Sequence, residues 1–297
     1  MKKILLASSA LAMMAGAAAA EVTLSGSARM GIIDDFGDDN TGFTSRARVV
    51  FTLSGESDSG ISFGATFRAD NAVGANTGDA GSVFVSGAFG KLSMGDLDGA
   101  AQQAVGNVDG VGLTGLSDLN EAVYLHNVLD IANFDPTAAY EYSSGNFTGI
   151  LSISNPDNNA IAGADADPTY GLGLKYAAGD YTFALGYETN SDADADHVIL
   201  GVNAAFGAVS LKANYGRLSV AGTDADQWHL SATYTADALA VTAFYSDEDD
   251  FGALGQGTAY GLGASYDLGG GASVVGGYSK NDTADTNAFD LGLSFSF

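Results

Sequence analysis

Four arginines stand out as side chains that could act on a passing solute. Arg29, Arg46, Arg48 and Arg68 each fall on the polar face of a segment in which polar and apolar residues alternate. Residues 96–135 follow as a long acidic segment without Lys or Arg, and its main candidate carboxylates are Asp96, Asp98, Asp109, Asp118 and Glu121. Opposite charges facing each other across a narrow aqueous passage create a transverse field, which favours small polar solutes over apolar ones. The sequence therefore predicts a pore constriction with a basic wall and an acidic loop; scattered surface charge is the alternative interpretation.

The alternation that positions these residues extends through most of the chain. It begins in residues 21–35, 46–54 and 61–70, where polar side chains oppose apolar ones. Further segments of this kind are centred on Val85, Leu92, Tyr140, Leu151, Leu172, Phe183, Leu200, Leu211, Leu230, Val241, Leu262, Val274 and Leu293. Period two is typical of half-buried strands. Together the segments predict about sixteen strands, and an even number is expected of a bacterial membrane barrel.

Tight connections alternate with long acidic ones, such as residues 155–167, 190–196, 220–226 and 246–257. This rhythm is typical of an outer-membrane barrel with short periplasmic turns and larger external loops. We therefore predict an all-β, transmembrane antiparallel β-barrel over residues 21–297, with the loop of residues 96–135 folded into the lumen. A soluble sandwich is the alternative. Tyrosines near the strand ends disfavour it, because Tyr suits a membrane–water boundary.

The first twenty residues have the composition of a cleaved secretory signal peptide. Lys2 and Lys3 precede an apolar stretch, residues 4–14, and Ala18 to Ala20 form a small-residue cleavage site. Removing the two lysines takes the formal charge from -25 to -27. So acidic a chain is not expected to bind nucleic acid, which requires clustered Lys and Arg. The absence of Cys excludes disulfides and thiolate metal sites.

The last residues alternate as a strand. Leu291, Leu293, Phe295 and Phe297 oppose Asp290 and its polar neighbours. A barrel must pair its last strand with its first to leave no open edge in lipid. We therefore expect the strand that begins at residue 21 to pair with the strand that ends at residue 297.

Other candidate sites are weaker. Among the three histidines, His126 lies four residues before Asp130. No nucleophile and base surround it in the sequence, so no enzymatic activity is expected. Residues 192–196 resemble the start of a calcium loop, but His197 stands where its Gly is needed and Asn203 where its Glu is needed. That stretch is expected to be a solvated loop.

Six runs of sequence carry a family resemblance: residues 21–26, 28–31, 45–49, 86–91, 94–96 and 260–271. They resemble the general diffusion porins of Gram-negative outer membranes, and most of all those of purple phototrophic alphaproteobacteria (Rhodobacter type). The resemblance implies a sixteen-stranded barrel that trimerises and passes small hydrophilic solutes and ions by passive diffusion. It also implies that Phe297 is an assembly signal for the barrel-insertion machinery, and that membrane lipid and lipopolysaccharide surround the barrel.

The same resemblance implies that the third loop folds inward to form the constriction. Arg29, Arg46 and Arg48 match basic wall positions of such a constriction, and Arg68 stands where a basic residue is also expected. No cofactor is required, although calcium can be held between third-loop carboxylates in this family. Small outward residues such as Ala28 fit the trimer, because they let barrels approach closely.

Two other functions remain open from the residues alone. A substrate-specific channel would need a run of aromatic residues in the lumen, and a plugged structural or adhesive barrel would need the third loop to block the passage. For an open pore, the net negative charge predicts a weak preference for cations.

Overall fold

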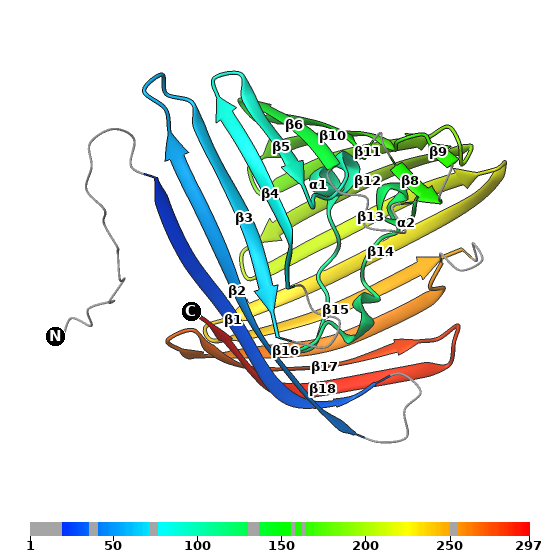
Figure 1. Ribbon diagram of the computed structural model, residues 1–297. Helices are drawn as coiled ribbons and strands as arrows, with labels where there is room; N and C mark the ends of the chain where they lie inside the picture. The colour runs from blue at the N-terminus through cyan, green and yellow to red at the C-terminus, as the bar shows by residue number, and fades with distance from the viewer. Residues whose placement is uncertain are drawn as a thin grey trace.

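The computed structural model describes residues 20–35, 41–71, 77–129, 137–155, 158–161, 164–249 and 255–297. Within these residues, sixteen antiparallel strands close into a barrel (Figure 1). The barrel strands are β1 (Glu21–Asp34), β2 (Gly42–Glu56), β3 (Ser62–Asp70), β4 (Thr77–Gly87), β5 (Gly90–Gly95), β6 (Thr137–Ser144), β7 (Phe147–Ile153), β10 (Tyr170–Ala178), β11 (Tyr181–Asn190), β12 (Ala195–Phe206), β13 (Val209–Val220), β14 (Thr223–Ala236), β15 (Leu239–Glu248), β16 (Thr258–Gly269), β17 (Ala272–Asn281) and β18 (Thr286–Ser296). Every strand centre predicted from the sequence falls inside one of them. The predicted signal peptide lies outside the described residues, apart from Ala20, and stays a prediction.

The ring is closed by its first and last strands, as the sequence predicts. β1 pairs antiparallel with β18, so that Ala28 lies opposite Phe295. At the end of the seam, Gly26 N donates to Phe297 O at 3.2 Å and Phe297 N donates to Gly26 O at 2.9 Å. With this pairing every barrel strand has two neighbours, so the sheet has no edge.

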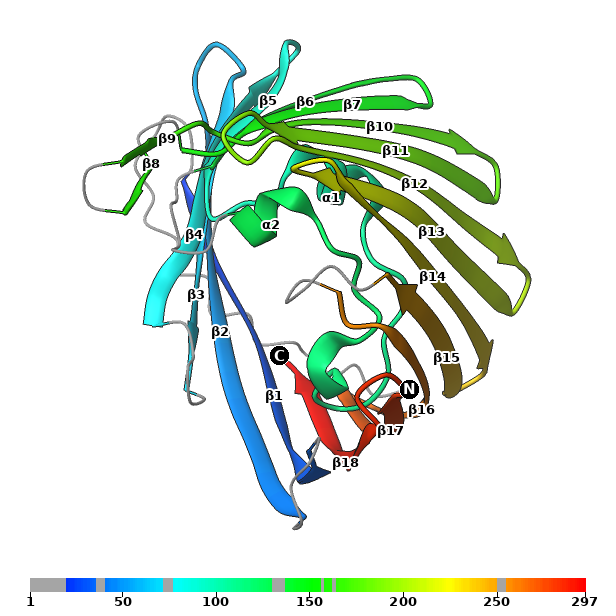
Figure 2. The same ribbon diagram turned by 90° about the vertical axis from the view of Figure 1, so that its right-hand side faces the viewer.

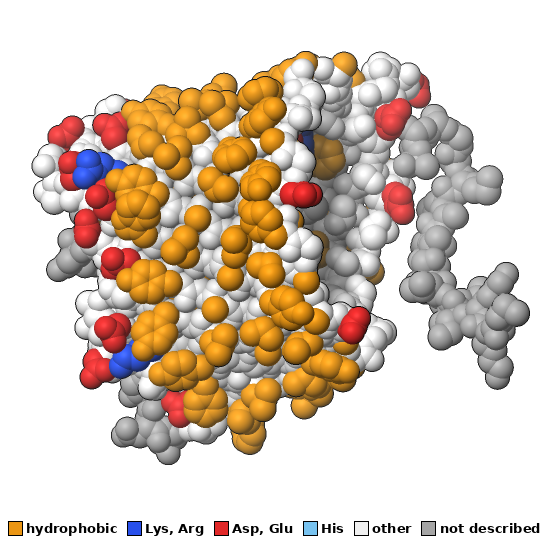
Figure 3. Space-filling model, turned by 180° about the vertical axis from the view of Figure 1, so that it is seen from behind, with side chains coloured by type: hydrophobic (Ala, Val, Ile, Leu, Met, Phe, Trp, Pro, Cys, Tyr) orange, Lys and Arg blue, Asp and Glu red, His pale blue; other side chains and the backbone are white. Residues whose placement is uncertain are grey.

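The two faces of each strand meet different surroundings. Apolar side chains point outward; Val22 and Leu24 of β1, for example, are 63% and 61% exposed. Figure 3 shows apolar side chains spread over this outer face, with most charged side chains near its edges. A sandwich would bury this face between two sheets. The sandwich alternative is therefore wrong, and the exposed apolar face is the one that lipid covers.

The buried apolar clusters lie where the third loop packs on the inner wall. Two examples are the cluster of Val108, Val111, Leu116, Leu119, Phe244, Ala259 and Ala288 and the cluster of Ala101, Val105, Ala122, Tyr124 and Ile199. The loop carries α1 (Ala100–Val105), a 3-10 turn η1 (Leu116–Asp118) and α2 (Leu125–Leu129). In Figure 2 these elements lie inside the ring of strands. No helix in the described part of the chain is long and apolar enough to cross a membrane.

One pair of strands was not predicted. β8 (Asn158–Ile161) and β9 (Ala164–Ala166) form a small separate hairpin in the segment that the sequence predicts as a long connection. These strands are too short to show a clear alternation of polar and apolar residues.

Candidate pore constriction

The strand register brings the four arginines together on the inner face of β1, β2 and β3. Arg29 lies directly opposite Arg46. Arg48 lies opposite Asp70, and Arg68 opposite Val50, which shares the face of Arg48. Arg29, Arg48 and Arg68 all act electrostatically on Arg46. Adjacent strands are about 4.8 Å apart, so these guanidinium groups form one basic patch.

Asp70 balances part of this charge. Its carboxylate accepts hydrogen bonds from Arg48 Nε and Nη2 at 3.0 and 2.9 Å, and Arg68 Nε lies 3.5 Å away. Among the described residues, no carboxylate lies within 4 Å of Arg29 or Arg46 to form an ion pair. Arg29 Nη1 instead donates to Leu113 O of the third loop at 3.3 Å. The patch therefore keeps a net positive charge.

The loop begins against a part of the wall that contains Gly173 of β10 and Gly186 of β11. α1 contacts β7, β10, β11 and β12. A Cβ atom on Gly173 would overlap Ala100 O, and one on Gly186 would overlap Ala101. The small residues of α1 can thus approach the sheet backbone, and Lys175 Nζ of β10 donates to Gln103 O at 3.2 Å.

Replacing Gly173 with Val should displace α1 from this wall. The added side chain would occupy the space of Ala100 and Ala104. Overpacking of this kind costs about 1–3 kcal/mol, and the helix can relieve it only by moving toward the lumen. We expect a smaller single-channel conductance in a planar bilayer. Gly149→Val is the matched control, because a Cβ there meets only Leu174 at 3.7 Å. Equal conductance of both variants would contradict the packing of α1 against Gly173.

The middle of the loop is held by Asp290 of β18. Its carboxylate accepts from Leu113 N at 2.8 Å, from Thr114 N at 2.7 Å and from Thr114 Oγ1 at 2.8 Å. Asp290 is buried, and η1 contacts β17 and β18. Charge-assisted hydrogen bonds to buried backbone N–H groups are among the stronger polar contacts in proteins. The turn around Leu113 is therefore fixed to the wall beside Arg29.

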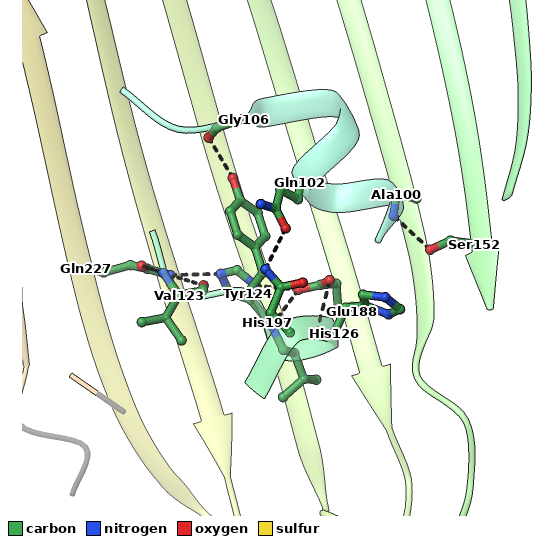
Figure 4. A network of polar contacts seen from close by, with 12 residues as sticks. Ala100, Gln102, Gly106, Val123, Tyr124, His126, Ser152, Glu188, His197 and Gln227 are labelled. Carbon is green, nitrogen blue, oxygen red and sulfur yellow. Dashed lines mark hydrogen bonds and ion pairs between the residues drawn. The ribbon is translucent and has the colours of Figure 1, made fainter. Parts of the chain in front are cut away.

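A second anchor holds residues 123–126 (Figure 4). Gln227 of β14 exchanges two hydrogen bonds with the backbone of Val123, at 2.8 and 2.9 Å. Glu188 of β11 accepts from Leu125 N at 2.8 Å and from His197 Nδ1 at 2.9 Å. In the ring, β14 lies four strands and β11 seven strands from β18, so these anchors and Asp290 hold different parts of the loop.

Four of the five candidate carboxylates of the loop, Asp96, Asp98, Asp118 and Glu121, have exposed side chains. Desolvation inside the barrel raises the pKa of Asp98. His126 partly offsets this rise by attraction, and Asp96 adds to it by repulsion. Desolvation, followed by repulsion from Asp118, raises the pKa of Glu121. Confinement within the barrel thus makes ionisation costly even where the side chains are open to water.

Asp109 differs from the other four. Its carboxylate lies 2.7 Å from Lys212 Nζ of β13 and accepts from Thr233 Oγ1 of β14 at 3.2 Å. Asp109 N donates to Ser231 Oγ at 2.9 Å. Asp109 therefore ties the loop to the wall on the side away from β2 and β3, and its charge is already balanced.

The acidic side chains of the described residues are not clustered around one point. The described residues contain no group of three or more Asp, Glu, His or Cys side chains placed to hold a metal ion. Calcium requires six to eight oxygen ligands, with several carboxylates among them. Of residues 192–196, Asp192 accepts from Asp167 N at 2.6 Å and Asp196 accepts from Tyr187 at 2.5 Å.

Sequence reasoning missed two groups of residues, all on the polar face of a strand. Asp70 binds the basic patch. Glu188, Gln227 and Asp290 hold the loop, and His197 and His229 are bonded to Glu188 and Gln227. Asp70 and His229 gave a local signal, because residues i and i+2 of a strand share a face and they follow Arg68 and Gln227 by two positions. The contacts of Glu188, Gln227 and Asp290 with the loop join residues far apart in the chain.

A closed antiparallel barrel of sixteen strands with an apolar outer face is a β-barrel of the outer-membrane type. The family model for Gram-negative porins matches residues 7–286, and the chain belongs to that family. It is 40% identical to the porin of Rhodobacter capsulatus over 305 residues, with 93% of this chain and 100% of that protein covered. The porin of Fuscovulum blasticum is 27% identical over 301 residues, with the same coverage.

Solved structures agree with this assignment. A porin structure refined at 1.8 Å has a TM-score of 0.79 at 35% identity, with 93% of this chain and 100% of that chain covered. A variant of Rh. blastica porin with 23% identity has a TM-score of 0.76 at the same coverage and is similar in fold. The protein is therefore an outer-membrane porin that passes small hydrophilic solutes by passive diffusion.

Proposed function

We propose that solutes pass between the third loop and the wall of β1, β2 and β3, where the basic patch faces loop carboxylates. The observation that carries this proposal is the distribution of unbalanced charge. Arg29 and Arg46 have no ion-pair partner among the described residues, while Asp98 and Glu121 are exposed on the loop. α1, α2 and η1 make their main contacts with β7, β10–β12, β17 and β18. The loop reaches β1 where Leu113 O accepts from Arg29, and it is anchored away from β2 and β3, which carry the other three arginines. Polar solutes align with the resulting transverse field, whereas apolar solutes must displace oriented water.

Single-channel recording in a planar bilayer tests this function. Purified protein should give large, ohmic conductance steps. A plugged structural barrel would give none. A substrate-specific channel would give small steps that one class of solute blocks at low concentration.

The proposed passage carries no catalysed reaction and needs no cofactor. We propose that the barrels assemble as a homotrimer, surrounded by lipid and lipopolysaccharide, after delivery by the barrel-insertion machinery with Phe297 as the recognition signal. Unboiled protein should then migrate on a gel as a compact species that shifts on heating. Calcium at third-loop carboxylates stays a prediction.

Cation preference should weaken as the pH falls. Because the pKa values of Asp98 and Glu121 are raised, these carboxylates lose their charge above the ordinary carboxyl range of about pH 4. Each protonation removes a negative charge that attracts cations, so the cation-to-anion permeability ratio should fall as the pH is lowered, and the fall should start above the ordinary carboxyl range. Reversal potentials in a salt gradient measure this ratio. The Asp98→Asn/Glu121→Gln variant should start at the lower ratio and stay there; an unchanged pH dependence in that variant would contradict the assignment.

A further inference from the structure

A chain of buried polar side chains lies on the inner wall where the loop returns toward β6. Its members, on β11, β12, β14 and β15, are Glu188, His197, Gln227, His229 and Glu248. The side chains of Glu188, His197 and His229 have no exposed area. Diffusion of solutes does not require buried histidines, and buried polar groups are costly unless their partners satisfy them. Their partners here are mainly one another and the third loop (Figure 4).

Gln227 has four polar neighbours, and all of them fix the same orientation of its amide. Nε2 lies 2.9 Å from Val123 O and 3.0 Å from His197 Nε2. Oε1 lies 2.8 Å from Val123 N and 3.2 Å from His229 Nε2. The amide nitrogen only donates and the amide oxygen only accepts, so His197 Nε2 must be an unprotonated acceptor. The proton of neutral His197 then sits on Nδ1, which donates to Glu188 at 2.9 Å.

A second proton on His197 is incompatible with this arrangement. It would place an N–H of His197 against the N–H of Gln227. Turning the amide would relieve the clash, but Oε1 would then face Val123 O and Nε2 would face Val123 N. Both hydrogen bonds to Val123 would be lost. Since the wall occupies one side of the loop, the released segment can move only toward the lumen.

Protonation of the other groups near His197 does not turn the Gln227 amide. Glu188 keeps its contacts with Leu125 N and His126 N, at 2.8 and 3.4 Å, when His197 is protonated. His229 already donates through Nε2 and has Glu248 Oε1 at 3.6 Å, so a proton on its other nitrogen leaves Gln227 in place. The ring of Tyr124 packs edge-on against His197 at 5.7 Å. Loop acids Asp98 and Glu121 act electrostatically on Tyr124, and Asp98 acts on His126. No Lys or Arg of the described residues forms an ion pair with these groups.

We propose that His197 is an acid sensor that controls the position of the third loop through the amide of Gln227. The proposal rests on the pore function proposed above. At neutral pH the amide holds Val123 on the wall and the passage is wide. In acid the amide turns, residues around 123 leave the wall, and the passage narrows. His197 and Gln227 are positioning residues, because they act on solutes only through the loop.

The test compares single-channel conductance of the full-length protein in neutral buffer at about pH 7.5 and in acid at about pH 4.5. Wild-type conductance should fall roughly twofold or more in acid, with frequent closures. His197→Gln keeps a neutral donor and acceptor at both pH values and should hold its neutral-pH conductance. Gln227→Ala lacks the contact at every pH, so its conductance should already be low at neutral pH and should not fall further.

Two controls separate this sensor from other titrating groups. The Asp98→Asn/Glu121→Gln variant removes the lumen carboxylates of raised pKa and should retain the wild-type fall in conductance. His126→Gln should retain it as well. An acid response in His197→Gln or Gln227→Ala that matches the wild type would overturn the proposal. A wild-type conductance that does not change with pH would also overturn it. In that case the open pore would still support the porin function. If His197→Gln does not give a heat-shifted barrel on a gel, Gln227→Ala decides the question.

Discussion

Replacing Asp290 with Ala is expected to release the turn of the third loop that lies beside Arg29. The change removes the acceptor for Leu113 N, Thr114 N and Thr114 Oγ1 at a buried position. Each backbone N–H left without a partner costs about 1–3 kcal/mol, so the loss of local stability should be roughly 2–5 kcal/mol. Opening of the turn should then become about 30-fold to 5,000-fold more frequent.

Hydrogen exchange measures this release directly. In Asp290→Ala, amides of residues 112–116 should exchange faster by that factor, and the single-channel current should become noisy. Asp267→Ala is the control, because Asp267 accepts from Gly269 N in a turn between strands and does not touch the loop. Equal protection of residues 113 and 114 in both variants would show that Asp290 does not hold the loop.

Removing the unpaired arginines should shift ion selectivity strongly toward cations. Arg29 and Arg46 face each other across β1 and β2 without a carboxylate partner in the described part of the chain. At about 5 Å, each charge acts on an ion with roughly 0.8 kcal/mol in water. Together the two charges act with roughly 1.6 kcal/mol, so the double variant Arg29→Gln/Arg46→Gln should raise the cation-to-anion permeability ratio about tenfold or more at about 10 mM salt. The effect should shrink at about 1 M, where the screening length is about 3 Å.

Reversal potentials in a salt gradient provide the ratio, and Arg217→Gln is the matched control. Arg217 is bound to Asp226 at 2.7 Å, on the face of β13 that carries Tyr215 rather than the buried Asn214. Its loss should leave selectivity almost unchanged. Equal shifts in the two variants would mean that selectivity follows total charge and not the basic patch.

The barrel could be predicted from sequence because the membrane imposes a simple rule on every strand. Lipid outside and water inside require alternation with period two, and this pattern locates β1 to β7 and β10 to β18 without knowledge of their partners. Closure by β1 and β18 follows from the same physics, since an unpaired edge in lipid is costly. The short strands β8 and β9 are not subject to this rule and were missed.

The loop anchors could not be predicted in this way. Leu113 and Asp290 are 177 positions apart, and Val123 and Gln227 are 104 positions apart. An inward Gln, Glu or His reads in sequence as one more polar residue facing a wet lumen. Asp109 could not be assigned correctly for the same reason. Its place in the acidic segment predicts a carboxylate of the constriction, whereas the fold pairs it with Lys212.

Water fills the inside of this barrel and lipid covers its outside, and cysteine labelling of the two faces of one strand tests this most directly. Arg46 and Ala47 are neighbours on β2 that point to opposite faces, and the natural chain contains no cysteine that would compete for a thiol reagent. A charged, water-soluble methanethiosulfonate applied to open pores should label Arg46→Cys rapidly and change its conductance, while Ala47→Cys should react only with an apolar reagent dissolved in the lipid. Rapid modification of residue 47 from water, with residue 46 reached only from lipid, would contradict the account.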